Sequence, residues 1–478
     1  MKILLIRPAN PLQSLGLLPH TKPTNLAYLA AYLLEHGFKV KIVDYEIDVY
    51  TESYFIELLK REAPDVVGIS CITSVIRSGA MMSNVVKSLF PEIVTVVGGA
   101  HASALPKQTL REFPSFDYLV YGEGEESLLE LCRCIEEGNP IIDVEGLAYR
   151  DGAEIIQNPK RNLIEDLDTL PFPARFLLSN KKQKGYSSKG FSNKLNSADL
   201  FTARGCSYGC TFCAIQSVFC KRVRFRDLKF VKKELDQLMR DEGVEHIVIA
   251  DDTFSLDESR AMAICGIFLE AGLRSWNCET RVDKVSKRLL KMMAESGCRK
   301  VTFGIESGSQ RIRNLINKGF SSQEIEQAVC WAKEVGIEHV EGNFIIGVDP
   351  SETSGDIDMT RNMICSLPWT IVSVAVVVPF PGTALYRQMK AKSFLHKDAD
   401  WNDFEMFGKT PKWHTENFSE KDLIMLQRKL TKEFFLRPSY LLKRLLAFKS
   451  WSDMVSWFLA GHAYLQWYFK IRSKGKVL

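Results

Sequence analysis

Three cysteines stand close together near the middle of the chain, in the segment Arg-Gly-Cys-Ser-Tyr-Gly-Cys-Thr-Phe-Cys that ends at Cys213. Cys206, Cys210 and Cys213 follow a C-x3-C-x2-C spacing, so one loop can bring three thiolates to a single metal centre. Zinc sites normally have four protein ligands, and soft thiolates also bind iron–sulfur clusters. Three thiolates leave one position open, and a [4Fe-4S] cluster with one iron free for a small molecule fits this donor set. Gly205 and Gly209 favour a bulky ligand, because glycine lets the backbone pass close to it.

The other cysteines make a weaker case for metal chemistry. The chain has 12 cysteines, more than a cytosolic enzyme of this length needs and far fewer than a disulfide scaffold. Cys220 follows the cluster segment closely and offers two alternatives, a zinc site with four thiolates or a second role in catalysis. Three unrelated thiols are a further alternative. The remaining cysteines are expected to be ordinary thiols: Cys71, Cys132, Cys134, Cys265, Cys278, Cys298, Cys330 and Cys365.

The first part of the chain alternates short β-branched runs with amphipathic segments, which predicts a parallel sheet covered by helices on both faces. Strands are expected at residues 3–6, 40–43, 66–70 and 93–97, and helices at residues 25–35, 51–61 and 79–89. Ligands of such doubly wound sheets bind beyond the carboxyl ends of the strands. The loops expected to bind a ligand are therefore residues 8–23, 71–78, 98–106 and 122–126.

Two of these loops are rich in glycine, which would let the backbone approach a large planar or phosphate-bearing ligand. They are Val-Val-Gly-Gly-Ala-His at residues 96–101 and Tyr-Gly-Glu-Gly-Glu-Glu at residues 121–126. A generic nucleotide-binding turn is an alternative for both. The G-x-G-x-x-G fingerprint is absent after the first expected strand, which disfavours a nicotinamide cofactor.

Later segments predict a hairpin, a linker and a second βα series. A hairpin is expected to turn at Asp151-Gly152, and the Lys-, Ser- and Gly-rich residues 181–197 indicate a linker. Further strands at residues 246–250, 301–305, 343–347 and 371–379 are too few for a complete eight-stranded barrel and predict a partial one. The expected units are residues 1–140, a doubly wound Rossmann-like domain; 141–198, hairpin and linker; 199–390, a partial (β/α)6 TIM-type barrel; and 391–478, a helical carboxyl-terminal region.

Composition limits the classes of function. The 478 residues carry a net charge of +4, with 46% hydrophobic and 25% charged residues, which is typical of a soluble globular protein and disfavours disorder and nucleic acid as a partner. No secretory segment is found at the start, so a reducing cytosol is expected. Residues 457–469 are apolar but shorter than the roughly 20 residues of a transmembrane helix. From about residue 391 onward the chain interleaves aromatic and basic side chains, and this segment is expected to be a helical cap on the barrel. The alternatives are that it covers a substrate cavity or contacts lipid head groups.

The cysteine segment, with Phe212 before the last cysteine, resembles the signature of the radical S-adenosylmethionine (SAM) superfamily. Further similar segments follow in the family's order: Asp251-Asp252, Arg281-Val-Asp283, and residues 304–307, 342–347 and 379–383. The resemblance implies that SAM chelates the open iron through its amino and carboxylate groups. It also implies that Phe212 lies near adenine, that Arg281, Glu306 and Ser307 lie near the ribose and methionine parts, and that the strand ending at Gly347 supports adenine.

Some of these positions have simpler explanations. Glu306 could be a strand-end carboxylate paired with Arg281 or Lys300, and Asp251 and Asp252 could cap a helix. The family often has a Gly-Gly-Glu element that holds the amino group of SAM, but Ala-Asp-Asp-Thr stands here at residues 250–253. This departure leaves the amino-group contact unassigned.

Together with the radical SAM signature, the two glycine-rich turns resemble the cobalamin-binding domain of the B12-dependent radical SAM family. The resemblance implies cobalamin contacts at Thr73, Ser74, Gly98, Gly99, His101, Gly122, Glu123 and Gly124. Thr73 and Ser74 could equally form a hydroxyl-capped turn before the next helix. An Asp-x-His-x-x-Gly sequence that would ligate cobalt is absent. His101 is therefore expected to pack by the nucleotide tail, with cobalamin bound without a histidine ligand, although a lone histidine is often an ordinary hydrogen-bonding residue.

The resemblance implies an enzyme with three cofactors: a [4Fe-4S] cluster, SAM and cobalamin. The reduced cluster would cleave SAM to a 5′-deoxyadenosyl radical, which abstracts a substrate hydrogen, and methylcobalamin would most simply methylate the resulting carbon radical. The enzymatic alternative is a cyclase or rearrangement enzyme acting on a tetrapyrrole-like or lipid substrate. The non-enzymatic alternative is a B12 or iron–sulfur sensor. The expected partners are a small-molecule, lipid or peptide substrate and an electron donor such as flavodoxin or ferredoxin.

Overall fold

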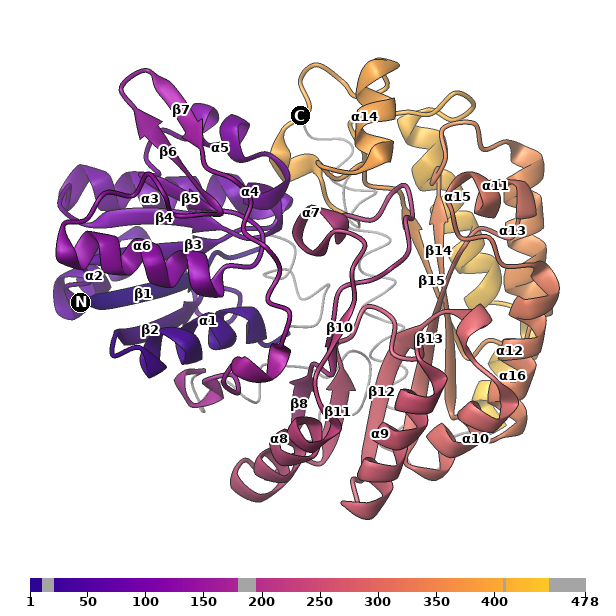
Figure 1. Ribbon diagram of the computed structural model, residues 1–478. Helices are drawn as coiled ribbons and strands as arrows, with labels where there is room; N and C mark the ends of the chain where they lie inside the picture. Colours follow the sequence, from indigo (N-terminus) through magenta and orange to yellow (C-terminus); the bar gives the residue numbers. More distant parts are fainter. Residues whose placement is uncertain (11–20, 179–194, 407–409, 447–478) are drawn as a thin grey trace.

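Two large sheets organise the chain, and Figure 1 shows them in separate halves of the molecule. The structure, a computed structural model, describes residues 1–10, 21–178, 195–406 and 410–446. The first sheet has seven strands in the order β2-β1-β3-β4-β5-β6-β7, parallel from β2 to β5 and antiparallel at β6 and β7. The strand order reverses beside β1, where doubly wound sheets open a crevice for a ligand. The strands are β1 (Lys2–Arg7), β2 (Lys39–Asp44), β3 (Val66–Ser70), β4 (Val94–Gly98), β5 (Tyr118–Val120), β6 (Leu147–Asp151) and β7 (Glu154–Gln157).

Helices cover both faces of this sheet. Alternate residues of β1 point to opposite sides: Leu5 packs in one hydrophobic cluster with α1 and α6, and Leu4 in another with α2 and α3. The helix α1 buries Leu26, Ala30 and Leu33 at helical spacing. The helices are α1 (Thr24–Glu35), α2 (Glu52–Glu62), α3 (Ile76–Leu89), α4 (Ala100–Ala104), α5 (Pro106–Glu112) and α6 (Glu125–Glu137).

The second sheet has six parallel strands in the order β15-β14-β13-β12-β11-β8. They are β8 (Ser197–Leu200), β11 (His246–Ile249), β12 (Ser275–Thr280), β13 (Cys298–Glu306), β14 (His339–Ile346) and β15 (Ile371–Val376). The helices of this half are α8 (Leu228–Asp241), α9 (Glu258–Glu270), α10 (Lys287–Glu295), α11 (Gln310–Leu315), α12 (Ser322–Glu334), α13 (Ser354–Ser366), α14 (Ala384–Ala391), α15 (Glu420–Phe435) and α16 (Pro438–Leu446). The expected α/β fold class, a doubly wound domain followed by a partial barrel and carboxyl-terminal helices, is confirmed.

The two faces of the second sheet differ in polarity. On the face covered by helices, Trp276 packs edge-on against the rings of Phe254 and Phe268. The residues on either side of Trp276 in β12 point the other way. There Ser275 Oγ lies 2.7 Å from His246 Nδ1, and on the neighbouring strands β13 and β14 Lys300 Nζ lies 2.5 Å from Glu341 Oε2. The face away from the helices, which lines the barrel, is therefore polar.

The hairpin expected between the two domains belongs to the first sheet, because β6 pairs with β5 and continues into β7. This differs from its expected place with the linker. Residues 179–194 of the expected linker and residues 447–478 of the carboxyl-terminal region lie outside the described residues. In the described part of that region, α15 packs on the barrel and Gln427 Nε2 donates to Val374 O at 2.9 Å. The domain boundaries stay a prediction, and among the described residues no helix is long and apolar enough to cross a membrane.

One buried carboxyl group gives the barrel half a pH-dependent stability. Glu352 is fully buried, and its Oε2 accepts a hydrogen bond from Gly347 N at 2.6 Å. Burial raises the pKa of Glu352 to about 8; Asp356 and Asp349 add to the shift, and Arg311 opposes it. The folded protein therefore holds a proton that the unfolded chain releases above its ordinary carboxyl pKa. Stability should fall as the pH rises from about 4.5 to about 8, because the unfolded state binds fewer protons in this window.

We expect Glu352→Gln, which keeps an oxygen for the Gly347 amide but cannot ionise, to leave stability unchanged near pH 5. Above pH 8 it should raise the unfolding midpoint by roughly 2 °C or more. Thermal unfolding followed by circular dichroism under anaerobic conditions at the two pH values would measure this. An equal effect at both pH values would contradict a role for the ionisation of Glu352.

Candidate active site

The cysteine segment lies between the two halves of the molecule, where the carboxyl ends of both sheets point. It starts after β9 (Ala203–Arg204), contains the short helix α7 (Gln216–Phe219) and returns through β10 (Arg224–Phe225), which pairs antiparallel with β9 (Figure 1). Residues 205–223 are called the cluster loop below. Lys160, just after the hairpin of the first sheet, donates from Nζ to Ser217 O at 3.3 Å and to Val218 O at 3.1 Å. The cluster loop is thus held against the amino-terminal half.

Cys206, Cys210 and Cys213 are half-buried thiols on this loop. Burial raises the pKa of Cys213 to about 11, and the nearby thiols of Cys210 and Cys206 add to the shift. The three sulfurs are thus electrostatic neighbours that can ligate different irons of one cluster. The described residues contain no group of three or more His, Cys, Asp or Glu side chains arranged for a single metal ion. Cys220 is exposed, and its sulfur lies 3.5 Å from Lys160 Nζ.

Charged groups from the ends of β12 and β13 and from the loop after α11 gather beside Cys210. Lys318 Nζ lies 2.9 Å from Glu306 Oε1 and donates to Gly304 O at 3.0 Å. Burial disfavours the charged form of Lys318, but Glu306 and the nearby Cys210 outweigh burial and raise its pKa. A Cβ at Gly304 would lie 2.7 Å from Glu306 Oε1, so glycine is needed for the ion pair to lie across the strand. Glu306 itself has a left-handed backbone, with φ of 68°.

Arg281, at the end of β12, completes this group. Its guanidinium carbon lies 3.6 Å from the centre of the Tyr208 ring in the cluster loop, and Nη2 donates to Lys318 O at 2.6 Å. Nε is bound to Asp283 Oδ1 at 2.9 Å, whereas Nη1 is buried with no hydrogen-bond partner among the described residues. A buried donor without a partner is costly. The cations Arg281 and Lys318 and the carboxylate Glu306 therefore fit the carboxylate and amino ends of an amino acid beside the thiols.

The other expected SAM residues have mixed positions. Phe212 is half-buried and packs against Ile312 and Val348, at the ends of the strands where adenine was expected. Ser307 is fully buried, and its Oγ lies 3.3 Å from Thr360 Oγ1, so its hydroxyl serves the packing of α13. Gly347 has a left-handed backbone, with φ of 73°. A side chain would fit poorly there, because a Cβ would lie 3.0 Å from Leu423. Contacts of these residues with SAM stay a prediction.

The two aspartates after β11 have separate positions. Asp251 is buried; its Oδ1 accepts hydrogen bonds from Thr202 N at 2.7 Å and Ala203 N at 3.0 Å. It therefore braces the segment that leads into the cluster loop. Asp252 lines a cavity inside the barrel, and burial, aided by the charge of Glu279, raises its pKa to about 6. The helix-capping alternative was wrong for both, because Asp257 caps α9.

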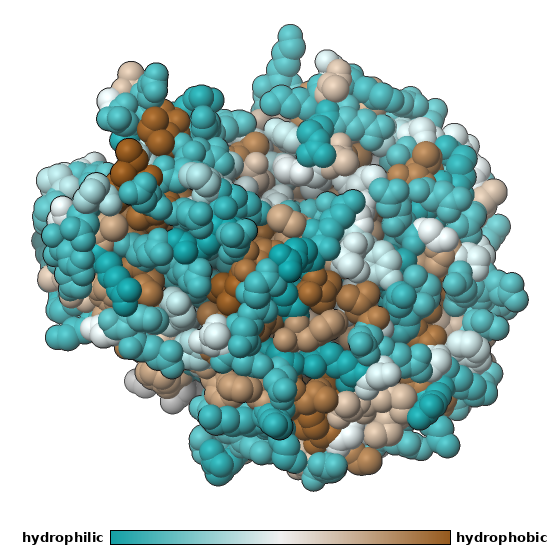
Figure 2. Space-filling model, in the orientation of Figure 1, coloured by the Kyte–Doolittle hydropathy of each residue, from teal (hydrophilic) through white to brown (hydrophobic). Residues whose placement is uncertain are grey.

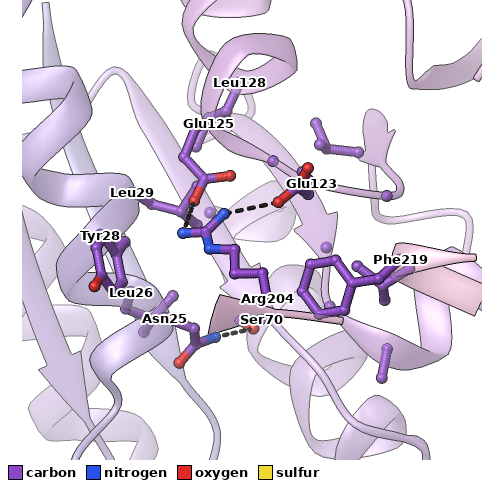
Figure 3. Close-up of a pocket in the computed structure, with 18 of the residues that line it drawn as sticks. Asn25, Leu26, Tyr28, Leu29, Ser70, Glu123, Glu125, Leu128, Arg204 and Phe219 are labelled. Carbon is purple, nitrogen blue, oxygen red and sulfur yellow. Dashed lines mark hydrogen bonds and ion pairs between the residues drawn. The ribbon is translucent and has the colours of Figure 1, made fainter. Parts of the chain in front are cut away.

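A mainly apolar cavity of about 350 Å³ lies at the carboxyl edge of the first sheet, against the cluster loop. Hydrophobic side chains gather between the two halves of the molecule (Figure 2). One part of the cavity wall is the backbone of Gly98, Gly99, Gly122 and Gly124. Another part is formed by the side chains of Leu26, Leu29 and Leu128 (Figure 3). Glycine walls and apolar side chains suit a flat aromatic group such as the tail base of cobalamin. We call this space the tail cavity; no histidine is among the described residues that line it.

Other expected cobalamin residues lie outside the lining of the tail cavity. His101 is buried; its Nδ1 is 3.3 Å from Thr73 Oγ1, and its ring packs edge-on against Trp401 at 4.9 Å. Burial lowers the pKa of His101 to about 4, so the ring is neutral. Ser74 is also buried. Glu123 does line the cavity, but its carboxylate is bound to Arg204 and Arg224.

Three residues of these sites escaped the sequence analysis. Lys318 comes 12 residues after Glu306, too far for a local pattern to pair them. Asn25 and Ser70 line the tail cavity and share a hydrogen bond of 3.2 Å (Figure 3). Ser70 is the last residue of β3, and Asn25 lies in the first turn of α1, the helix that follows β1, so their positions beyond strand ends were the available signal.

Comparisons with known proteins agree with this geometry. Residues 18–132 match the B12 binding domain family, and residues 200–364 match the radical SAM superfamily. An uncharacterized methyltransferase of Pyrococcus horikoshii is 33% identical over 445 residues, which cover 93% of this chain and 94% of that protein. The anaerobic magnesium-protoporphyrin IX monomethyl ester cyclase of Rubrivivax gelatinosus is 28% identical over 451 residues, 92% of this chain and 78% of that protein.

A solved structure has the same fold. The cobalamin-dependent SAM radical enzyme OxsB, with aqua-cobalamin and SAM bound, matches with a TM-score of 0.76 at 18% identity, over 98% of this chain and 72% of that one. The resemblance noted in the sequence, and with it the cofactor set of the family, is confirmed. The chain is therefore an enzyme that belongs to the radical SAM superfamily and carries an amino-terminal B12-binding domain.

Proposed function

We propose that this enzyme methylates an unactivated carbon of a small polar molecule, with SAM, a [4Fe-4S] cluster and cobalamin as cofactors. The observation that carries the proposal is the meeting of two cavities. The tail cavity and a second cavity inside the barrel share Asn25, Phe201, Ala250 and Asp252 in their walls. A substrate in the barrel would therefore lie between the cobalamin side and the cluster side. The extensive match to a protein named a methyltransferase supports the same reaction.

The chain's own residues divide the binding work. When bound, the cluster and SAM supply a 5′-deoxyadenosyl radical, and cobalamin supplies a methyl group. Cys206, Cys210 and Cys213 would hold the cluster. Arg281 and Lys318 would bind the carboxylate of SAM, and Glu306 its amino group, because these charges are complementary and lie beside Cys210. Glu306 thereby supplies the contact that the missing Gly-Gly-Glu element left unassigned.

The barrel cavity favours a polar substrate. It has a volume of about 450 Å³ and is lined by the ends of β8, β11 and β12 together with residues 21–25 of the amino-terminal half. Asp199, Asp252 and Glu279 contribute carboxylates to this wall. Thr24 Oγ1 donates to Asp199 Oδ2 at 3.2 Å, and Lys22 Nζ to Ser197 O at 2.7 Å, so both halves close the space. An acidic wall suits a substrate with amine or hydroxyl donors better than a lipid.

The second candidate is a cyclisation without net methylation. It is favoured by the relative from Rubrivivax gelatinosus that is named a cyclase and matches 92% of this chain. Either reaction needs an external electron donor, for which reduced flavodoxin or ferredoxin is the proposed partner. In a methylation the methyl group of SAM ends up in the product, whereas in a cyclisation it does not, so following this group decides between the two reactions.

The deciding experiment uses SAM labelled with a CD3 group, the reconstituted enzyme, a chemical reductant and a panel of polar metabolites. We expect one product heavier by a CD3 group less one hydrogen, together with 5′-deoxyadenosine and S-adenosylhomocysteine. A product that has lost hydrogen and carries no label would instead support the cyclase. Formation of no 5′-deoxyadenosine under any condition would overturn both.

Replacing Cys210 by alanine should remove one iron ligand. The variant is expected to lose the visible charge-transfer absorbance of the cluster and to form no 5′-deoxyadenosine, while cobalamin still binds. Cys220→Ala is the matched control, because this exposed thiol lies on the same loop; it should keep both properties. A Cys210→Ala protein with an intact, active cluster would refute the assignment.

Lys318→Gln tests the SAM contacts separately from the cluster. Loss of this buried cation should weaken SAM binding roughly tenfold, since a charge-assisted hydrogen bond contributes about 1.5–3 kcal/mol. The iron content and cluster absorbance should remain, and equilibrium dialysis with SAM measures the affinity. Lys287→Gln, which alters an exposed ion pair with Glu334, is the control and should bind SAM normally. Unchanged SAM affinity in Lys318→Gln would exclude this role.

A further inference from the structure

The base of the cluster loop is closed by two facing arginines. In the antiparallel pair of β9 and β10, Arg204 stands opposite Arg224. Gly205 follows with φ of 93°, and a Cβ there would lie 2.1 Å from Arg222 O, so the two ends of the loop are in backbone contact. Because Cys206 is only two residues beyond Arg204, any displacement of Arg204 would move the first cluster ligand with it.

One carboxylate of the amino-terminal half binds both arginines. Glu123 Oε1 lies 2.9 Å from Arg204 Nη1, and Glu123 Oε2 lies 2.5 Å from Arg224 Nη1. Oε2 also accepts a hydrogen bond from Ile164 N at 3.0 Å. Arg204 Nη2 is bound in turn by Glu125 Oε1 at 2.7 Å (Figure 3). We call Glu123, Glu125, Arg204 and Arg224 the clamp.

The clamp is buried and electrically balanced. The side chains of Glu123 and Arg224 are each 4% exposed, and that of Arg204 is 11% exposed. Burial disfavours ionisation of Glu123, but Arg224 and Arg204 together outweigh burial and lower its pKa. Glu123 is therefore ionised at neutral pH, and its removal would leave two buried guanidinium groups short of a counter-charge.

Three of the four clamp residues also form a wall of the tail cavity. Gly122, Glu123, Gly124, Glu125 and Arg204 all line it. A group bound in the tail cavity thus touches the loop whose carboxylates hold the base of the cluster loop. Ion pairs therefore join the wall of the tail cavity directly to the base of the cluster loop.

We propose that Glu123 is a positioning residue that fixes the cluster loop relative to the cobalamin-binding half, and so sets the separation of cobalt and cluster. Its carboxylate acts on the two arginines rather than on cobalamin itself, which changes the role expected for it from the sequence. The glycines on either side provide the cavity wall, while Glu123 provides the link. This inference rests on the cofactors of the family and is independent of the substrate and of net methylation.

The test measures the separation directly. Cob(II)alamin and the reduced cluster each carry an unpaired electron, so pulsed electron paramagnetic resonance reports the distance distribution between them. Wild type should give a narrow distribution. Glu123→Gln, which keeps the shape but leaves two buried arginines with one carboxylate, should shift it to longer and more variable distances with both cofactors still bound. Glu126→Gln is the matched control, because Glu126 lies only three residues later, in the first turn of α6, and pairs with Arg161 near the surface; it should match wild type.

Two further variants keep the test decisive if Glu123→Gln does not fold or if its effect has another cause. If Glu123→Gln does not fold, Arg224→Lys, which keeps the charge but loses the geometry of the guanidinium, should show the same shift. The double variant Glu123→Gln/Arg224→Gln restores the charge balance without restoring the link, so its distance distribution should stay broad; a return to the wild-type distribution would contradict the role of the link. A fully loaded Glu123→Gln protein with the wild-type distance distribution would overturn the proposal. Selective loss of cobalamin from Glu123→Gln would also overturn it, by showing that Glu123 holds the cofactor directly.

Discussion

The buried ion pairs between Glu123 and the arginines at the base of the cluster loop are the constraint on which the site depends. Two separately built sheets must present their carboxyl ends to one another, and hydrophobic contact alone would allow them to slide. Ion pairs with side-chain exposures of 4% to 11% do not tolerate sliding, because a displaced partner leaves an uncompensated charge that costs about 3–5 kcal/mol. Such pairs contribute little net stability and much specificity of arrangement. In this molecule they define where the cluster loop lies.

A similar arrangement occurs at the other end of the site. Glu306 and Lys318 form an ion pair across β13, and the missing side chain at Gly304 makes room for it. Arg281 joins them by stacking on Tyr208 of the cluster loop. In both places a carboxylate at or just beyond a strand end binds cations, and in both an arginine touches the cluster loop or forms its base. The loop is therefore fixed from the cobalamin side by one carboxylate and from the barrel side by another group of charges.

Local patterns allowed much of the fold and part of the site to be predicted from the sequence. Strands such as β1 and β3 are continuous apolar runs, and three thiolates within one short loop are a local feature. Long-range pairing could not be predicted: Glu123 and Arg224 are 101 residues apart, and His101 is buried by Trp401 from the far end of the chain. A polar residue in a glycine-rich turn suggests a ligand contact, yet the orientation of the short helix α4 places His101 in the interior. Ser307 likewise uses its hydroxyl for helix packing.

The division of polarity between the two cavities explains how one site can hold unlike ligands. The tail cavity is apolar and walled by glycine backbone, which suits a flat aromatic group, whereas the barrel cavity has carboxylates in its wall. Adjacent residues after β11 serve both sides: Asp251 turns back to hold Thr202 and Ala203, and Asp252 faces the cavities. A substrate with amine or hydroxyl groups would bring hydrogen-bond donors to these carboxylates, whereas an apolar lipid would bring none. The same strand end therefore braces the segment that leads into the cluster loop and presents a carboxylate to the barrel cavity.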